Sequence, residues 1–133
     1  MDRPAIRFGA SYYPPHHDPA DWARDMDLMA AHGLTVVRSA ELLASWDRIE
    51  VARGRWDFEW LDELFDLAAE RGMRILLGTG SQSPPVWMAE AWPDLQVLSR
   101  DGVRYPIATS WSCACKDHPG YLEEVERWIG QLI

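Results

Sequence analysis

Two amphipathic segments, each closed by a glycine and followed at once by a short apolar run, constrain the fold of this chain most. Apolar side chains recur at helical spacing in both segments, which predicts helices ending at Gly33 and Gly72. The runs behind the glycines are short and apolar, which predicts buried strands. A helix over 19–32 precedes a strand over 34–38, a helix over 58–71 precedes a strand over 73–77, and an earlier strand is expected over 6–11. Strands that alternate with helices predict parallel βαβ units and an α/β fold.

The connections between these elements differ in length on the two sides of the strands. The turns from helix to strand are short, whereas the segments 39–57 and 78–118 that follow strands are long. We expect 39–57 to be irregular, a short helix over 84–89, a hairpin around Arg100-Asp101-Gly102, and a last helix over 119–133. Long functional loops on one side are typical of a (β/α)8 barrel. The chain has no Gly-x-Gly-x-x-Gly after a strand, so a dinucleotide-binding sheet has no support.

Charge and composition restrict the partners. The 133 residues carry a formal net charge of −8, and Lys116 is the only lysine. Nucleic acids and anionic membranes need clustered basic residues, so neither is expected as a partner. No apolar run approaches the ~20 residues of a membrane span, and the first residues contain no apolar signal core, so we expect a cytoplasmic protein. The eight tryptophans either fill the core or present flat faces to sugars.

Several motifs occur in an order that is typical of one enzyme family. The sequence has Tyr12-Tyr13-Pro14, then Trp46-Asp47-Arg48-Ile49-Glu50, then Gly54-Arg55-Trp56-Asp57-Phe58, and a most specific stretch over 77–88 that contains Pro84-Pro85-Val86-Trp87-Met88. With these motifs the chain resembles glycoside hydrolase family 42, the β-galactosidases, from about Phe8 to its last residue. It departs from the family pattern at Pro15-His16, where an acidic residue is usual, and at Trp111-Ser112-Cys113, where a sugar-binding arginine is usual.

The resemblance implies a fold and an activity. Residues 1–133 would be the N-terminal portion of a catalytic (β/α)8 barrel, comprising its first three βα units and the following helix. The complete enzyme would be a retaining hydrolase of β-galactosides or related glycosides. Its acid/base and nucleophile would come from strands four and seven, beyond Ile133, so this chain alone is predicted to be inactive. The alternatives are a truncated, non-catalytic barrel fragment and a carbohydrate-binding module.

Arg38 is the first candidate for the site, because it stands at the C-terminal end of the second expected strand. The resemblance implies that it lies near the nucleophile. The alternative is a structural ion pair with Glu41 or Glu50. These two carboxylates are not expected to be a catalytic pair, because they share one loop, and Glu50 is expected to be structural. The substrate-binding residues predicted here are Arg38, Tyr13, Glu41, Trp46 and Trp87. For the two tryptophans, stacking on a pyranose and packing within the loops remain open.

Metal binding is expected to be a minor feature of this chain. Cys113 and Cys115 are too close for an easy disulfide, and with His118 they fall short of the about four ligands of a structural zinc. The resemblance implies that such a zinc, held through Cys113 or Cys115, would need the complete parent enzyme. His16 and His17 beside Asp18 more simply form a polar loop before a helix cap. We therefore expect no cofactor, a carbohydrate substrate as the partner, and self-association into a homo-oligomer as a further option.

Overall fold

The computed structural model describes residues 6–40, 45–105 and 114–133 of the chain. The chain forms two compact units. The first unit comprises Met1–Ser39 and Phe58–Gly78, and the second comprises Ala40–Asp57 and Thr79–Ile133. Each unit therefore combines segments that are distant in the sequence.

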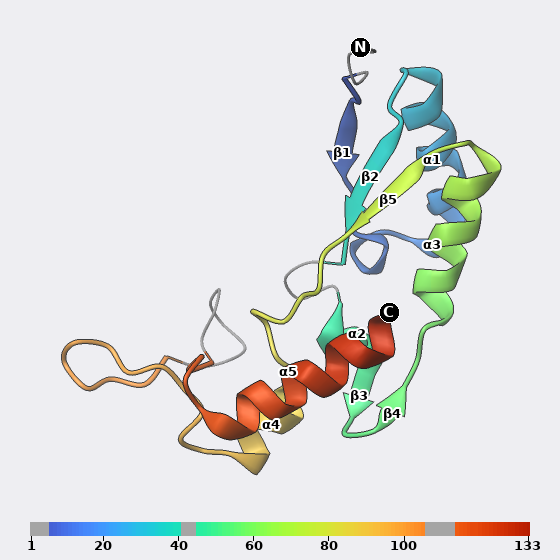
Figure 1. Cartoon of the computed structure of the whole chain (residues 1–133). Coiled ribbons are helices and arrows are strands. Elements are labelled where there is room, and N and C mark those ends of the chain that lie inside the picture. The colour runs from blue at the N-terminus through green and yellow to red at the C-terminus, as the bar shows by residue number, and fades with distance from the viewer. Residues whose placement is uncertain (1–5, 41–44, 106–113) are drawn as a thin grey trace, which may run out of the picture. The chain divides into compact units, whose positions relative to one another are not determined.

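The first unit is built on a parallel sheet in which the strand order follows the chain order (Figure 1). The sheet contains β1 (Gly9–Ser11), β2 (Val36–Ser39) and β5 (Arg74–Leu77), with β2 in the middle. Ser11 is opposite Arg38, and Arg38 is opposite Leu76. The three predicted strands and their parallel arrangement are confirmed, although each strand is shorter at its start than expected.

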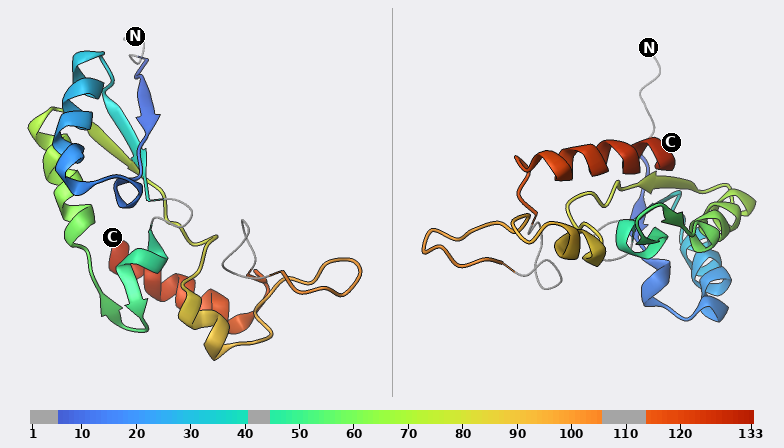
Figure 2. Two further views of the ribbon diagram at one scale, coloured as in Figure 1. Left: turned by 180° about the vertical axis from the view of Figure 1, so that it is seen from behind. Right: turned by 90° about the horizontal axis from the view of Figure 1, so that it is seen from below.

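Two helices cover one side of this sheet, as both views in Figure 2 show for this unit. They are α1 (Trp22–Ala31) and α3 (Glu59–Glu70), and the single turns η1 (Pro14–His16) and η2 (Pro19–Asp21) precede α1. The Asp18 carboxylate accepts a hydrogen bond from the backbone N–H of Ala20 at 3.0 Å, which confirms the predicted cap. The buried side chains between the helices and the sheet include Trp22, Met26, Val37, Leu61, Leu64 and Ala68.

The second unit begins with structure that the sequence analysis did not predict. Segment 39–57 was expected to be irregular, and this prediction is wrong. It contains α2 (Trp46–Ile49) and an antiparallel pair of short strands, β3 (Glu50–Ala52) and β4 (Arg55–Trp56). These elements are too short for a periodic signal. Their side chains contact residues 71 to 82 positions later in the chain, which a local pattern cannot reveal.

The rest of the second unit contains the elements that the sequence predicted. Helix α4 (Val86–Ala91) and helix α5 (Pro119–Leu132) correspond to the expected helices. Between them Leu98 and Arg104 form an antiparallel bridge, and the Ser99 N–H donates to the Val103 carbonyl at 2.8 Å, which confirms a hairpin around Gly102. Within the described ranges no helix is long and apolar enough to cross a membrane.

Candidate functional site

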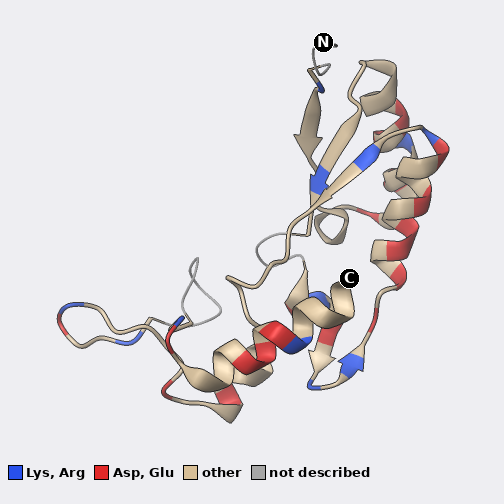
Figure 3. Cartoon of the chain, viewed as in Figure 1, with Lys and Arg blue, Asp and Glu red and all other residues tan. Residues whose placement is uncertain are grey.

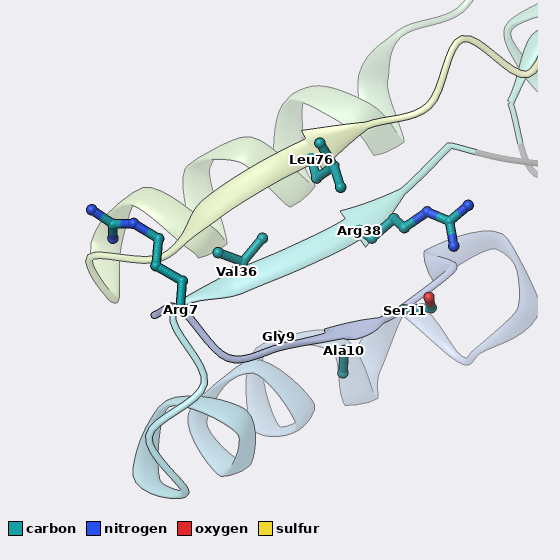
Figure 4. Close-up of a pocket in the computed structure, with 7 residues that line it drawn as sticks. All are labelled: Arg7, Gly9, Ala10, Ser11, Val36, Arg38 and Leu76. Atoms are coloured by element: carbon teal, nitrogen blue, oxygen red, sulfur yellow. The ribbon is translucent and has the colours of Figure 1, made fainter. Parts of the chain in front are cut away.

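The sheet of the first unit carries Arg38 on the side that the helices leave uncovered. Side chains alternate along a strand, so the buried Val37 and the exposed Arg38 face opposite ways. Arg38 shares its side with Ser11 and Leu76 of the neighbouring strands, and these residues line one hollow (Figure 4). The hollow has a volume of about 250 Å³ and is lined by Arg7, Gly9, Ala10, Ser11, Val36, Arg38 and Leu76.

Charge is separated between the layers of this unit. Figure 3 shows basic residues on β2 and β5 and acidic residues along α3. The strand residues concerned are Arg38 and Arg74, both exposed, and they stand on the same side of the sheet because Arg74 pairs in register with Val36. The open side of the sheet is therefore positively charged and also displays Leu76, which is 58% exposed. Such a surface suits a carboxylate or a polar ligand that has an apolar face.

Tyr13 follows β1, and the structure leaves it half buried beside His16, with ring centroids 5.7 Å apart. Its neighbour Tyr12 is buried and fixes the loop. The Tyr12 hydroxyl donates to Asp25 at 3.1 Å, and its ring stacks on His17 at 4.7 Å. Burial, together with the adjacent Asp25 carboxylate, raises the pKa of Tyr12 well above its usual range. Tyr12 and His17 thus hold the segment that presents Tyr13.

In the second unit a buried carboxylate organises the loop after β2. Glu50 is fully buried and accepts three hydrogen bonds. The donors are Trp46 Nε1 at 2.7 Å, the Gly54 backbone N–H at 2.6 Å and Arg127 Nη2 at 2.6 Å. A buried carboxylate is tolerated when it is paired and its oxygens are satisfied, and Glu50 meets both conditions. These contacts agree with the structural role that the sequence favoured for Glu50.

The same arginine links Glu50 to a second buried carboxylate, that of Glu124. Arg127 contacts Glu124 Oε2 at 2.5 Å, and Arg53 Nη2 contacts Glu124 Oε1 at 2.7 Å. Burial by itself would raise the pKa of Glu124, but hydrogen bonds from Arg53 and Arg127 hold that pKa below its usual value. Sequence reasoning missed this network. Its available signal was the spacing of Glu124, Arg127 and Trp128, which lie on one side of α5 at helical intervals.

The two tryptophans selected from the sequence have different environments. Trp46 is fully buried and stacks on Trp128, with ring centroids 5.6 Å apart and planes 4° from parallel. Trp56 stacks on Trp128 as well, at 5.9 Å. Trp46 therefore packs within the loop in this chain, the second of the two alternatives. Trp87 is half buried, and its Nε1 donates to the backbone carbonyl of Glu50 at 3.2 Å.

The remaining candidates concern Glu41 and metal binding. Glu41 and Cys113 lie outside the described residues. Cys115 is a free, half-buried thiol. The His118 Nδ1 accepts from the Tyr121 backbone N–H at 3.3 Å at the start of α5, and its Nε2 lies 3.5 Å from Asp94. Among the described residues no group of three or more potential metal ligands comes together.

Comparison with known proteins places this geometry in a family. The model of the glycoside hydrolase family 42 β-galactosidases matches residues 11–133. The chain is 40% identical to β-galactosidase Bga of Halorubrum lacusprofundi over 128 residues, which cover 96% of this chain and 18% of that protein. It is 38% identical to β-galactosidase BgaA of Clostridium cellulovorans over 99 residues, which cover 74% of this chain and 15% of that protein.

Solved structures agree with the sequence comparison. The β-galactosidase structure from Halorubrum lacusprofundi matches 96% of this chain with a TM-score of 0.87 and 35% identity, over 19% of its own length. The β-galactosidase from the psychrophile Marinomonas ef1 matches the same share with a TM-score of 0.87 and 28% identity. These neighbours are barrel enzymes with mixed α/β structure, and the chain spans about a fifth of their length. The chain therefore belongs to glycoside hydrolase family 42, the β-galactosidase family.

Proposed function

We propose that residues 1–133 supply the first three βα units of a (β/α)8-barrel catalytic domain in a retaining glycoside hydrolase of β-galactosides or related glycosides. The family match supports this proposal, and so does the parallel sheet whose strand order follows the chain. In such a barrel the helices form the outer ring and the opposite side of the strands faces the interior. Helices α1 and α3 lie on one side of the sheet, and Arg38, Ser11 and Leu76 lie on the other.

The position of Arg38 carries the proposal. Barrel enzymes bind substrate at the C-terminal ends of their strands, and Arg38 is the penultimate residue of β2. A guanidinium at that end stabilises an ionised carboxylate by lowering its pKa, which a glycosidase nucleophile requires. Tyr13, after β1, and the half-buried Trp87 are proposed as further sugar contacts, because an aromatic ring can stack on the apolar C–H face of a sugar. Glu41 completes the proposed set.

Both catalytic carboxylates would come from later strands of the barrel. In a retaining mechanism a carboxylic acid protonates the glycosidic oxygen, and a carboxylate about 5–5.5 Å away forms the glycosyl-enzyme intermediate. This chain would contribute the binding floor and the cation beside the nucleophile. The buried Glu50 and Glu124 are bound to arginines, so neither is proposed as the proton donor.

A chimera tests the proposal. Residues 11–133 would replace the matching segment of the Halorubrum lacusprofundi β-galactosidase, and hydrolysis of nitrophenyl β-galactoside would be measured. We expect turnover in the chimera. In Arg38→Lys the charge stays but the planar fork is lost, so turnover should fall at least about tenfold, or ~1.4 kcal/mol of transition-state stabilisation.

Arg74→Lys is the matched control, because Arg74 stands on the same side of the sheet at the opposite end of a neighbouring strand. Its turnover should remain close to that of the parent chimera. An inactive but folded chimera would contradict the proposed function. A lower melting temperature with unchanged turnover in Arg38→Lys would instead make Arg38 a structural ion-pair residue.

A further inference from the structure

Two tryptophans of the second unit depend on one residue for the position of their indole groups. Trp46 donates its Nε1–H to the Glu50 carboxylate at 2.7 Å, and Trp87 donates its Nε1–H to the Glu50 backbone carbonyl at 3.2 Å. The side chain and the backbone of Glu50 thus each hold one ring. Trp46 is fully buried, whereas Trp87 is half buried, so of this pair Trp87 is the residue with exposed surface.

The Glu50 carboxylate in turn is fixed from three directions. Gly54 contributes a backbone N–H from the turn between β3 and β4, and Arg127 contributes a guanidinium from α5. Arg127 also lies over the Trp56 ring, 4.8 Å from its centroid. Because the carboxylate cannot move without breaking one of these contacts, the backbone carbonyl that receives Trp87 is fixed as well. The Trp87 ring also packs against Trp92, and the two ring centroids lie 6.4 Å apart.

We infer that Glu50 is a positioning residue for sugar binding: its buried contacts fix the carbonyl that orients Trp87, and Trp87 receives the apolar face of a hexopyranoside. This inference rests on the proposed function. Glu50 itself is buried and does not touch the substrate. The C–H groups on one face of a galactoside make it the chemical class that suits a half-buried tryptophan, while the indole N–H stays bound to the protein.

The chain offers a matched pair of substitutions. Glu50→Gln keeps the size of the side chain but offers one acceptor oxygen and an NH₂ group to three donors, so at least one donor then faces a donor. Glu124→Gln makes the same change in a residue that is 3% exposed and whose carboxylate accepts its hydrogen bonds from Arg53 and Arg127. Both variants should lower stability, and only Glu50→Gln should release Trp87.

The experiment is two-dimensional NMR of the indole N–H groups in the full chain, with the Trp87 signal assigned through its loss in Trp87→Phe. We expect hydrogen exchange at Trp87 Nε1 to be roughly tenfold faster in Glu50→Gln and close to wild type in Glu124→Gln. Titration with methyl β-galactoside should shift the Trp87 signal in the wild type and in Glu124→Gln. In Glu50→Gln the affinity should be about tenfold weaker.

Each result decides a separate point. Unchanged exchange at Trp87 in Glu50→Gln, or equal acceleration in both variants, would overturn the positioning role. If the galactoside shifts no indole signal, sugar binding by Trp87 is overturned. If Glu50→Gln alone still accelerates exchange at Trp87, the positioning of Trp87 by Glu50 stands. Should Glu50→Gln fail to fold, Glu50→Asp and Glu124→Asp form the same comparison, because they keep the charge and shorten the reach.

Discussion

Gly80 is a position at which a small change should have a large effect. It is buried, its φ is +61°, and a Cβ built on it would lie 1.6 Å from Ser45 Oγ and 2.7 Å from Ser45 Cβ. Gly80→Ala would therefore combine two costs: a left-handed backbone conformation, and an overlap with a side chain that is fully buried. Gly102, in the same unit, has a φ of +77° and nothing within 4 Å of its Cβ position, so Gly102→Ala isolates the first cost.

The two costs have different sizes. A left-handed conformation costs a non-glycine residue about 1–2 kcal/mol, and the loss of unfolded-chain entropy on adding Cβ offsets about 0.4–1 kcal/mol of it. We therefore expect Gly102→Ala to lower the free energy of unfolding by about 1 kcal/mol. Overpacking adds about 1–3 kcal/mol, so Gly80→Ala should lower it by about 3 kcal/mol.

Urea unfolding, followed by tryptophan fluorescence, measures both effects. Ser45→Gly removes the atoms that the new Cβ would strike, so the double variant Gly80→Ala/Ser45→Gly should recover about 1–3 kcal/mol relative to the sum of the single changes. Equal losses in Gly80→Ala and Gly102→Ala would refute the reasoning, since the overlap would then cost nothing. Additive losses of unfolding free energy in the double variant would refute it as well, because the Ser45 side chain would then not be the group that the new Cβ overlaps.

Three further outcomes are expected. The purified chain should not hydrolyse nitrophenyl β-galactoside, and turnover that disappears in Glu50→Gln would contradict the structural assignment of that residue. The outer edges of β1 and β5 have no strand partner among the described residues, so the chain should form dimers or aggregates at micromolar concentration, and a monomeric sedimentation profile would oppose this. Burial raises the pKa of Tyr121 to about 12, so stability should fall as the pH rises from 10 to about 12, with a smaller slope in Tyr121→Phe.

The sign of the Tyr121 effect follows from the phenol being neutral in both states below pH 10. Above that value the unfolded chain begins to lose the proton, while the folded chain keeps it until about pH 12, so the equilibrium shifts toward unfolding. In the folded chain Lys116 Nζ donates to this hydroxyl at 2.7 Å, and the hydroxyl donates to the Ser81 carbonyl. An unchanged alkaline slope in Tyr121→Phe would show that other groups cause it.

The parts of the fold that could be predicted from the sequence are those with local signals. Asp18 before Pro19 marks a helix start, and Gly33 with φ +79° marks a helix end, so the helix between them needed no knowledge of distant residues. The β-branched residues Val36 and Val37 likewise predict a strand from the local sequence alone. The position of Arg38 on the helix-free side also follows from alternation along a strand of known direction.

The loop after β2 could not be predicted in this way, because distant residues decide its structure. Trp46 is an amphipathic ring whose exposure depends on whether another ring covers it, and Trp128, 82 positions later in the numbering, is the one that does. The sequence favoured a structural role for Glu50, but it gave no sign that Arg127 is the partner of this carboxylate. No local pattern links either pair.

The same contacts explain why the motif from Trp46 to Trp56 is a recognisable unit. Trp46 stands four residues before Glu50 and Gly54 four residues after it, and both donate a hydrogen bond to its carboxylate. The spacing of the motif therefore lets one carboxylate bind both the helix before it and the turn between β3 and β4. Trp56, at the end of the motif, stacks on Trp128 beside the arginine that binds Glu50. In this motif, which resembles that of sugar-cleaving enzymes, Trp46 and Glu50 are fully buried and out of reach of a sugar. We therefore expect these two residues to act through what they hold in place, and Glu50 holds the half-buried Trp87.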